Sequence, residues 1–506
     1  MKTVIKIPIT LSVLIALLCI PLSCTDGFEE LNTNPKLITD DDIKPSLLFT
    51  RVLKESGFDI LNVGRIGEFS SYIKRGDSGN MLALTDFSEP FNYYTAYIEN
   101  LAAIIRLTAD DPELRNQNAM ARIWKVWVYH RMTDAYGDIP YTEVATSFDD
   151  IVLYPKYDTQ ESIYVDMLKE LKEAASVLST SSEQKSFGAA DVLFAGDADS
   201  WKRFANSLRL RLALRVRYAD DTMAQQNVGD VFSSSLIANN DQNAVITSEG
   251  PDAADLSNTN PLYQEVVNGN PGAGSSISAG LALVENLLNN DDPRLTIYLE
   301  PNNDLEYIGG AINLTAEEKA LYPQSAKWSQ YFRNATYDFN VMQASEVNFL
   351  KAEAVLAGMA TGDANEFYQN GITLAMEQYG VDQADITAFL SSTAGVLSGT
   401  DEEKLEMIIT QKYLALIGDS YEVFAEHRRT GYPRVWIGSE PAAETDNALP
   451  RRLPYPLIEY NLNAQGVEGA AGRLTGGDKM KSRIWWDAKA GVPFAHPKQG
   501  IFPPYE

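Results

Sequence analysis

The side chains that most often carry out chemistry in proteins are scarce in this sequence. Its 506 residues contain three histidines, His130, His427 and His496, and two cysteines, Cys19 and Cys24. Zinc centres require a His-Glu-x-x-His helix or clustered Cys and His at ligand spacing, and neither pattern occurs. The sequence therefore predicts no metal site and no cofactor.

Two serine-containing motifs resemble nucleophile sites only superficially. Residues 418–420 read Gly-Asp-Ser, as in GDS-type esterases, but they fall between two late helical patterns, and Pro493 stands where those enzymes place an Asp before their His. Residues 75–79, Arg-Gly-Asp-Ser-Gly, lack the Gly-x-Ser-x-Gly elbow. A carboxylate pair for glycoside hydrolysis leaves no local signature among 69 acidic residues. We expect a protein that is not an enzyme, with a surface glycosidase or esterase as the alternative.

Aromatic side chains offer binding chemistry instead, because sugar rings stack on aromatic faces while polar groups bind their hydroxyls. The chain has 25 Tyr, 19 Phe and 7 Trp, so abundance alone selects none of them. Two stretches are the better candidates: the one that leads into a helical pattern at 91–108, and a loop-rich stretch near 240–340. The candidate ligand-binding residues are Tyr72, Arg75, Phe87, Tyr93, Tyr307 and Trp328. Packing within loops is the competing interpretation of each.

Composition and charge narrow the possible partners. Hydrophobic residues make up 45% and charged residues 22%, which is ordinary for a globular protein. The formal net charge is -27 at pH 7, and such a field repels the phosphates of nucleic acids and anionic lipids. We therefore expect no nucleic-acid partner, and a ligand that is neutral or cationic.

The N-terminus has the three-part layout of a secretion signal. Lys2 and Lys6 precede an almost wholly apolar run over residues 7–22, which is shorter than the ~20 residues that span a bilayer. Cys24 follows directly and resembles the lipid-acceptor cysteine of a bacterial lipobox, although Pro21 stands where the usual box has leucine. We expect residues 1–23 to be a lipoprotein signal peptide and Cys24 to be acylated. Cys19 is then removed, and no intramolecular disulfide is expected.

Apolar periodicity predicts helices through most of the remaining chain. Spacings of three and four recur in one pattern at 91–105, and residues 118–135 are apolar around most of a helical circumference. Residues 201–218 alternate partly like a strand, but their length favours a helix. Residues 345–379 predict two helices around a glycine-marked turn, similar to a tetratricopeptide hairpin. Further helical patterns lie at 163–178, 401–417 and 420–429.

The stretch near 240–340 differs because turn residues dominate it and clear stripes are few. Large irregular excursions of this kind often carry binding surfaces. We expect a mostly α-helical fold, in which tetratricopeptide-like hairpins pack against this loop-rich lobe, and a single domain over residues 24–506.

Several segments, taken in order, resemble one family. They are FEELNTNP after the lipid site, MTDAYGDIPYTEV at 132–144, FANSLRLRLALR at 204–215, DPRL at 292–295, SEVNFLKAEA at 345–354, EHRRTGYPRVW at 426–436 and RIWWD at 483–487. With the lipobox, this order resembles the SusD/RagB-like nutrient-binding outer-membrane lipoproteins of Bacteroidetes, in particular the second SusD-like branch.

The resemblance implies a fold and a role. It implies four tetratricopeptide-like hairpins and an irregular lobe, in a surface-exposed lid over a SusC-like TonB-dependent transporter that captures a nutrient, usually an oligosaccharide. The membrane contact would be the N-terminal lipid alone, and Asp26, Glu29 and Glu30 resemble the acidic signal that sends such lipoproteins to the cell exterior. A tetratricopeptide scaffold that binds proteins is a further alternative.

The family motifs also have purely structural interpretations. Gly137, Asp138 and Pro140 most simply end a buried helix. Glu426, Arg428 and Arg429 predict a buried ion-pair network, with Gly431 and Pro433 ending its helix. Trp485 and Trp486 are expected in the core or against the transporter. These motifs therefore identify the fold better than they identify a ligand site.

Overall fold

The helical patterns of the sequence become helices that pack side by side in a computed structural model. The model describes residues 44–60, 64–75, 82, 87–146, 152–250, 259–267 and 277–505. Cys24, the expected signal peptide and the acidic residues at 26, 29 and 30 lie outside these residues. Residues 45–506 form one compact unit, and its helical content confirms the mostly α-helical prediction.

The α-helices follow the chain in this order: α3 (Pro45–Ile60), α4 (Gly64–Phe69), α5 (Glu99–Thr108), α6 (Arg115–Tyr136), α7 (Gln160–Val177), α8 (Ala198–Arg215), α9 (Asp221–Val231), α10 (Pro261–Val267), α11 (Leu281–Asn289), α12 (Leu295–Tyr298), α13 (Ala316–Leu321), α14 (Ala344–Leu356), α15 (Ala364–Gln378), α16 (Gln383–Leu390), α17 (Asp401–Ala415), α18 (Ser420–Thr430), α19 (Glu459–Leu462) and α20 (Ala464–Arg473). Single turns at Glu89–Asn92, Tyr94–Ile98, Pro112–Leu114, Gly188–Ala190 and Asn240–Gln242 complete the helical elements.

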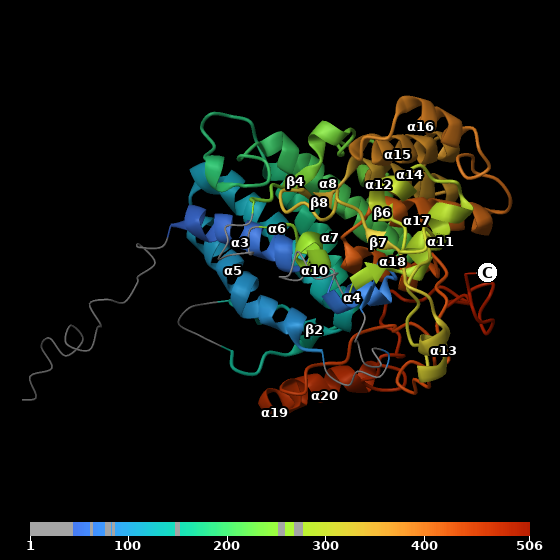
Figure 1. The fold of residues 1–506 in the computed structure, drawn as a ribbon. Helices are drawn as coiled ribbons and strands as arrows, with labels where there is room; N and C mark the ends of the chain where they lie inside the picture. Colours follow the sequence, from blue (N-terminus) through green and yellow to red (C-terminus); the bar gives the residue numbers. More distant parts are fainter. Residues whose placement is uncertain are drawn as a thin grey trace, which may run out of the picture. The chain divides into compact units, whose positions relative to one another are not determined.

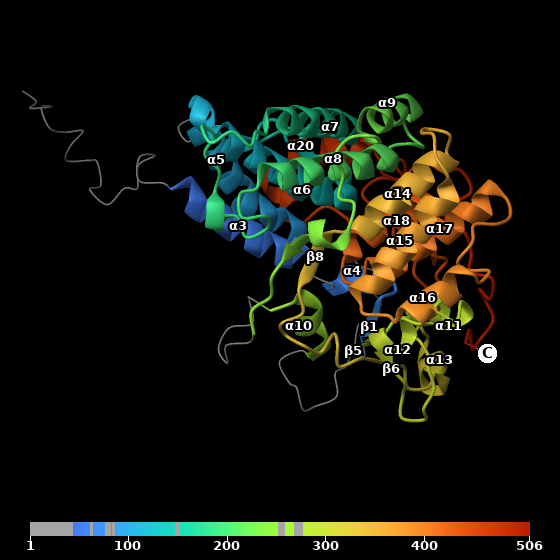
Figure 2. The same ribbon diagram turned by 90° about the horizontal axis from the view of Figure 1, so that it is seen from above.

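Consecutive helices form packed pairs, as the tetratricopeptide-like prediction requires. α5 packs on α6, α7 on α8, and α14 on α15, while α8 also meets α14 from a distant part of the sequence (Figure 2). Local signals define these elements: Thr159 and Asp197 cap the starts of α7 and α8 with their side chains. Gly137, with a φ of 91°, ends α6, as the sequence predicts.

The strand-like alternation in residues 201–218 is helical, and the structure gives the reason. Arg209, Arg211 and Arg215 of α8 are buried because they bind acidic partners on neighbouring helices. A buried helix that pairs its charges need not show a clean apolar stripe, so its periodicity is obscured. The helix that the length of residues 201–218 favours is therefore the correct interpretation.

The irregular lobe contains more short elements than the sequence indicates. Its strands are β4 (Ala244–Ile246), β5 (Ile277–Ala279), β6 (Leu299–Glu300), β7 (Lys327–Trp328) and β8 (Phe339–Met342), and outside it lie β1 (Ile73–Arg75), β2 (Ile139–Pro140) and β3 (Tyr157–Asp158). They form antiparallel two-stranded sheets: β1 with β5, β2 with β3, β4 with β8 and β6 with β7. The β1–β5 pairing joins the lobe to a segment about two hundred residues earlier, from Ile73 opposite Ala279 to Arg75 opposite Ile277.

Beneath these elements, α6, α8, α14, α17 and α18 share a buried ionic network. Arg131 binds Asp419 with both guanidinium nitrogens, at 2.8 and 2.7 Å. Arg215 and Lys412 both reach Glu422, at 2.6 and 3.2 Å. These side chains are almost completely excluded from solvent, and further pairs extend the network: Arg211 with Glu346, Arg217 with Glu353, and Arg429 with Glu353 and Glu426.

The prediction for the 426–433 motif is largely confirmed. Arg429 donates to Glu426 and Glu353, and Gly431 ends α18 in the left-handed conformation with a φ of 89°. Arg428 differs, because its guanidinium donates to the carbonyl oxygens of Asp134 and Arg451 and lies over the ring of Trp486, 4.8 Å from its centroid. Trp486 is buried in the core. The motif is therefore structural.

Residues 418–420 are structural as well. Asp419 caps the start of α18, where its side chain accepts from the backbone N–H of Glu422, and it is the partner of Arg131. Ser420 is completely buried. A hydroxyl without access to solvent is not placed to attack an ester, so this motif offers no support for the esterase alternative.

Candidate binding site

The structure separates the five aromatic candidates into two groups. Tyr72, Trp328 and Tyr307 belong to one apolar cluster around the β1–β5 sheet, with Tyr307 packed at its margin. Phe87 and Tyr93 belong to the main core of the helical array instead. The tertiary fold therefore brings β1 and the irregular lobe together through the β1–β5 pairing (Figure 2).

Burial distinguishes the candidates further. Tyr72 stacks on Tyr413, with ring centroids 4.6 Å apart, and its hydroxyl donates to the Tyr413 carbonyl oxygen. Burial raises the pKa of the Tyr72 phenol well above its usual range. Trp328 packs edge-on against Phe332 at 5.3 Å and is 1% exposed. Both rings are packing residues here and present no face to solvent.

Phe87 and Tyr93 are also enclosed. The Phe87 carbonyl oxygen accepts from the hydroxyl of Tyr136, and Tyr93 lies 5.5 Å from the ring of Tyr97. Tyr93 lies off the apolar stripe in sequence, but a π-helical turn at Tyr94–Ile98 changes the local periodicity, and Tyr93 is 4% exposed. Whether any of the four buried rings contacts a ligand remains a prediction.

Arg75 and Tyr307 keep access to solvent. The side chain of Arg75 is 31% exposed and forms an ion pair with Glu265 of α10. Burial raises the pKa of the Glu265 carboxyl, and the positive charge of Arg75 opposes this effect. Lys74, beside it, lies 3.6 Å from Glu68. This end of β1 therefore presents basic groups within an acidic protein.

Glycines allow three backbone segments to meet at this point. Gly280 and Gly310 form a parallel bridge, and the N–H of Gly310 donates to the Ala279 carbonyl oxygen at 2.7 Å. A Cβ on Gly280 would lie 2.0 Å from the carbonyl oxygen of Ser71, and one on Gly310 would lie 2.5 Å from the Cβ of Lys74. The close approach places the Cβ of Lys74 against Gly310, three residues after Tyr307.

Other partly exposed tyrosines of the lobe were missed by the sequence analysis. Tyr263 lies on α10, and Tyr331 and Tyr337 lie before β8, with their rings 4.9 Å apart. No periodic signal marks them, because their exposure depends on contacts with distant segments, such as that of Tyr331 with Tyr379 after α15. We call Arg75, Glu265, Tyr263 and Tyr307 the lobe-edge site. Its polar and aromatic groups suit a neutral ligand that both stacks and forms hydrogen bonds.

The described residues offer little for metal or membrane chemistry. Among them, no group of three His, Cys, Asp or Glu side chains is placed to hold a metal ion. None of their helices is both long enough and apolar enough to cross a bilayer. His130 and His427 are buried, and His496 lies 3.2 Å from Glu285.

Stacked helical hairpins that support a loop-rich lobe define a class of helical binding proteins. The chain belongs to the SusD-like family: a family model described as "Starch-binding associating with outer membrane" matches residues 74–456. This confirms the family that the sequence motifs indicate, and it is a family of outer-membrane-associated proteins. The chain has no match among curated proteins.

Solved structures agree with this membership. One described as a chitin-binding protein has a TM-score of 0.75 and 27% identity, covering 88% of this chain and 100% of its own. A chitin-binding SusD homologue from Flavobacterium johnsoniae has a TM-score of 0.74 and 26% identity, covering 88% and 98%. A SusD homologue from Bacteroides uniformis has a TM-score of 0.72 and 26% identity, with the same coverage.

Proposed function

We propose that this protein binds a neutral glycan and serves as the surface lipoprotein subunit of a SusC-like TonB-dependent importer. The observation that carries the proposal is the SusD-like match over residues 74–456, together with solved relatives that are described as chitin-binding. The strongly acidic chain suits capture of an uncharged ligand better than capture of an anionic one.

The lobe-edge site is the proposed point of contact. Arg75 and Glu265 form an ion pair at the end of β1, so each side chain holds the other in a fixed direction. Tyr263 and Tyr307 are partly exposed aromatic rings, and Tyr307 packs against the apolar cluster that contains Leu262 and Val266 of α10. Fixed polar groups beside aromatic faces are the usual composition of a sugar site.

Calorimetry with chito-oligosaccharides and malto-oligosaccharides tests glycan binding. We expect one of these series to bind, and the double variant Arg75→Ala with Tyr307→Ala to bind at least tenfold more weakly. Arg51→Ala is the matched control, because Arg51 is an exposed arginine on α3 whose partner is the nearby Glu55. Absence of heat with every glycan, or turnover of a glycan by the pure protein, would contradict the proposal.

Lipid attachment is a separate part of the proposal. Cys24 follows a signal-like segment and precedes acidic residues, so we expect Cys24→Ala to leave the precursor without lipid and to remove the protein from the cell surface. Cys19→Ala is the control, since Cys19 lies within the segment that would be removed. Surface labelling of Cys24→Ala at the wild-type level would refute the anchor.

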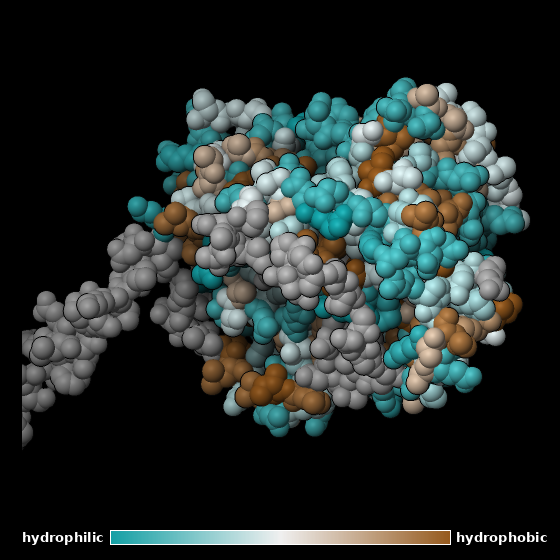
Figure 3. Space-filling view, viewed as in Figure 1, coloured by the Kyte–Doolittle hydropathy of each residue, from teal (hydrophilic) through white to brown (hydrophobic). Residues whose placement is uncertain are grey.

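The transporter partner requires a docking surface, and one exposed apolar patch is suitable. Leu457, Ile458 and Leu462 at α19 are 52–60% exposed, and Leu153 and Tyr154 are 74% and 68% exposed. The two segments are linked, because Asn463 donates to the Pro155 carbonyl oxygen at 2.8 Å. Figure 3 shows apolar surface over α19. Exposed patches of this kind mark interaction surfaces.

Co-purification under gentle extraction tests this surface. We expect the wild-type protein to retain a transporter-sized partner, and Leu457→Ser with Leu462→Ser to lose it while glycan binding persists. Leu321→Ser on α13 is the control, since Leu321 is also 65% exposed but lies away from α19 in sequence and in Figure 1. Recovery without any such partner would favour the tetratricopeptide scaffold alternative.

A further inference from the structure

Two adjoining cavities lie where the irregular lobe meets the helical array. One has a volume of about 280 Å³ and the other of about 270 Å³, and Asn290 and Thr393 line both. Their walls come from the end of α11 and its following loop, from Tyr368 of α15, and from α16, the loop after it and α17. We call this continuous depression the seam groove.

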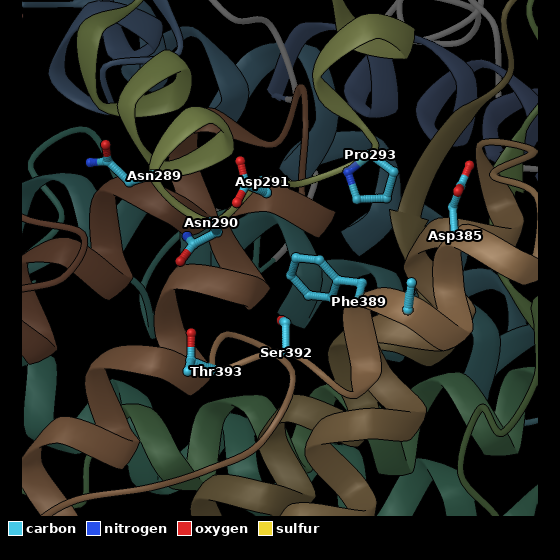
Figure 4. Close-up of a pocket in the computed structure, with 9 residues that line it drawn as sticks. Asn289, Asn290, Asp291, Pro293, Asp385, Phe389, Ser392 and Thr393 are labelled. Carbon is cyan, nitrogen blue, oxygen red and sulfur yellow. The ribbon is translucent and has the colours of Figure 1, made fainter.

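Figure 4 shows the lining of the first of these cavities. Asn290 and Asp291 extend from the loop after α11, and Ser392 and Thr393 from the loop after α16, with the ring of Phe389 between the two loops. Segments about one hundred residues apart therefore contribute polar groups to the same space, and an apolar ring lies within it.

The charges of the seam groove exclude some ligands. Of the residues that the structure describes, no Lys, Arg or His lines either cavity, whereas Asp291, Asp385 and Glu406 do. A phosphate or a uronic acid would lack a counter-charge there and would meet carboxylates. A metal ion is not indicated either, since no group of three ligating side chains occurs in the described part of the chain. The groove therefore suits a neutral ligand.

Gln411 supplies a fixed donor at the base of the groove. Its side chain lines the second cavity but is only 2% exposed, and its Oε1 accepts from Nη2 of Arg294 at 2.5 Å. Arg294 is itself held by Asp292. The orientation of the amide is therefore set by the guanidinium, and its Nε2–H groups have no partner among the described residues. Thr410, 9% exposed, adds a hydroxyl beside it.

Two asparagines supply fixed acceptors on the opposite wall. Asn286 donates through Nδ2 to the Ala282 carbonyl oxygen, and Asn290 donates to the Asn286 carbonyl oxygen, both at 2.7 Å. Their Oδ1 atoms thus keep a defined direction and accept no hydrogen bond from any residue that the structure describes. Groups whose orientation is set before binding lose little entropy when a ligand arrives.

We propose that the seam groove is a second glycan-binding site, separate from the lobe-edge site, for a neutral saccharide of about two rings. A sugar hydroxyl both donates and accepts, so it matches the Oδ1 acceptors of Asn286 and Asn290 and the Nε2 donors of Gln411. Phe389 and Met407 provide apolar contacts for the C–H faces of the ring. The cavity volumes fall at the small end of ligand sites, which sets the length of the saccharide.

The saccharide class rests on the proposed function, but the location of the site in the seam groove does not. The test must therefore distinguish a failure of this location from a failure of the proposed function. Methionine methyl groups are suitable reporters in the full-length protein, because Met407 lines the groove and Met407→Leu identifies its resonance. The probes are N,N′-diacetylchitobiose, maltose and, as an anionic control, digalacturonate. Calorimetry with longer oligosaccharides of the same series measures binding to the whole protein.

We expect chitobiose or maltose to shift the Met407 methyl resonance in the wild type and equally in Arg75→Ala with Tyr307→Ala. Thr410→Val with Gln411→Glu, which keeps an acceptor for Arg294 but removes the amide donors, is expected to weaken this response at least tenfold. Digalacturonate is expected to leave the resonance unmoved.

The outcomes distinguish the two proposals. If calorimetry detects glycan binding but no short saccharide moves the Met407 resonance, the seam groove inference is wrong and the proposed function stands. If no glycan binds at all, the proposed function fails and the saccharide assignment fails with it. A digalacturonate response equal to that of the neutral sugars would overturn the charge argument. The response of the Met407 resonance in the wild-type protein decides whether the seam groove binds a short saccharide. This test therefore does not depend on whether the variant folds.

Discussion

The buried ionic network and the seam groove are both built from polar side chains, but they differ in how completely those side chains are paired within the protein. In the network, Arg131, Arg215 and Lys412 each lie against a carboxylate and are shielded from water. In the groove, one polar atom of each amide is bound within the protein, the Oε1 of Gln411 and the Nδ2 of Asn290. The other polar atom of each amide has no hydrogen-bond partner among the described residues. Polar side chains that are fully paired within the protein stabilise the fold, whereas side chains that retain an unbound donor or acceptor indicate a ligand-binding site.

The electrostatics of the two regions follow from this difference. Burial alone would raise the pKa of Glu422, but Arg215, Arg211 and Lys412 outweigh it and hold the pKa well below its ordinary value. At the lobe edge, the carboxyl of Glu265 has one ion-pair partner, Arg75, and its pKa is raised. For these two carboxyls, the balance between burial and the neighbouring cations decides the direction of the shift.

The largest expected effect comes from breaking the network at its centre. Glu422→Gln removes one carboxylate that Arg215 and Lys412 share and leaves the buried network with an excess positive charge, so the free energy of unfolding should fall by about 3–5 kcal/mol in urea titrations. Glu173→Gln is the matched control, because Glu173 is 48% exposed in its pairs with Arg122 and Lys169, and its loss should cost less than about 1 kcal/mol. Equal effects of the two changes would show that burial does not govern these pairs.

The next effect tests the close approach at the lobe edge. Gly280→Ala would place a Cβ 2.0 Å from the backbone oxygen of Ser71, which cannot rotate away. We expect the free energy of unfolding to fall by about 3 kcal/mol, as in other overpacked sites. In Gly229→Ala the new methyl group meets nothing within 4 Å, and this change within α9 should be neutral or stabilising. A stable Gly280→Ala protein would mean that β1 and β5 separate easily.

A third effect depends on pH and belongs to the helical array. Burial and the positive charge of Arg451 lower the pKa of His427 to about 3, whereas an unfolded histidine titrates near ~6.5. The unfolded chain therefore takes up a proton at pH 5 that the folded chain does not. The contribution of His427 is present at pH 7 and should fall by about 2 kcal/mol by pH 5.

The matched variant for this pH effect is His427→Gln, which retains a donor for the Pro433 carbonyl oxygen but does not titrate. Its free energy of unfolding should depend less on pH between 7 and 5 than that of the wild type. Carboxylates titrate mostly below this range, so the interval isolates the histidines. An unchanged pH dependence would assign the loss to His130, whose pKa is also lowered by burial.

The smallest effect is expected at the lobe-edge site. Arg75→Ala should weaken glycan binding about tenfold, which corresponds to about 1.4 kcal/mol, and should change the free energy of unfolding by less than about 1 kcal/mol. Its side chain is partly exposed, so it contributes less to folding than the arginines of the network. A stability loss as large as that of Glu422→Gln would place Arg75 with the structural residues instead.

The sequence by itself determined the helical class and the family, because these depend on local information. Thr159 and Asp197 mark helix starts through their capping side chains, and Gly137 marks a helix end through its positive φ. The motif at Glu426 and Arg429 predicts an ion pair across one helical turn. Such signals act over three or four residues and remain visible without the fold.

Only the tertiary structure decided which polar and aromatic side chains remain accessible to a ligand. Tyr72 and Trp328 were plausible ligand contacts, but packing from Tyr413 and Phe332 encloses them. Gln411 has no sequence signal, since its free amide exists only because Arg294 lies beside it, 117 residues away in the chain. Exposure is set by contacts between distant segments, and no pattern within one segment encodes them.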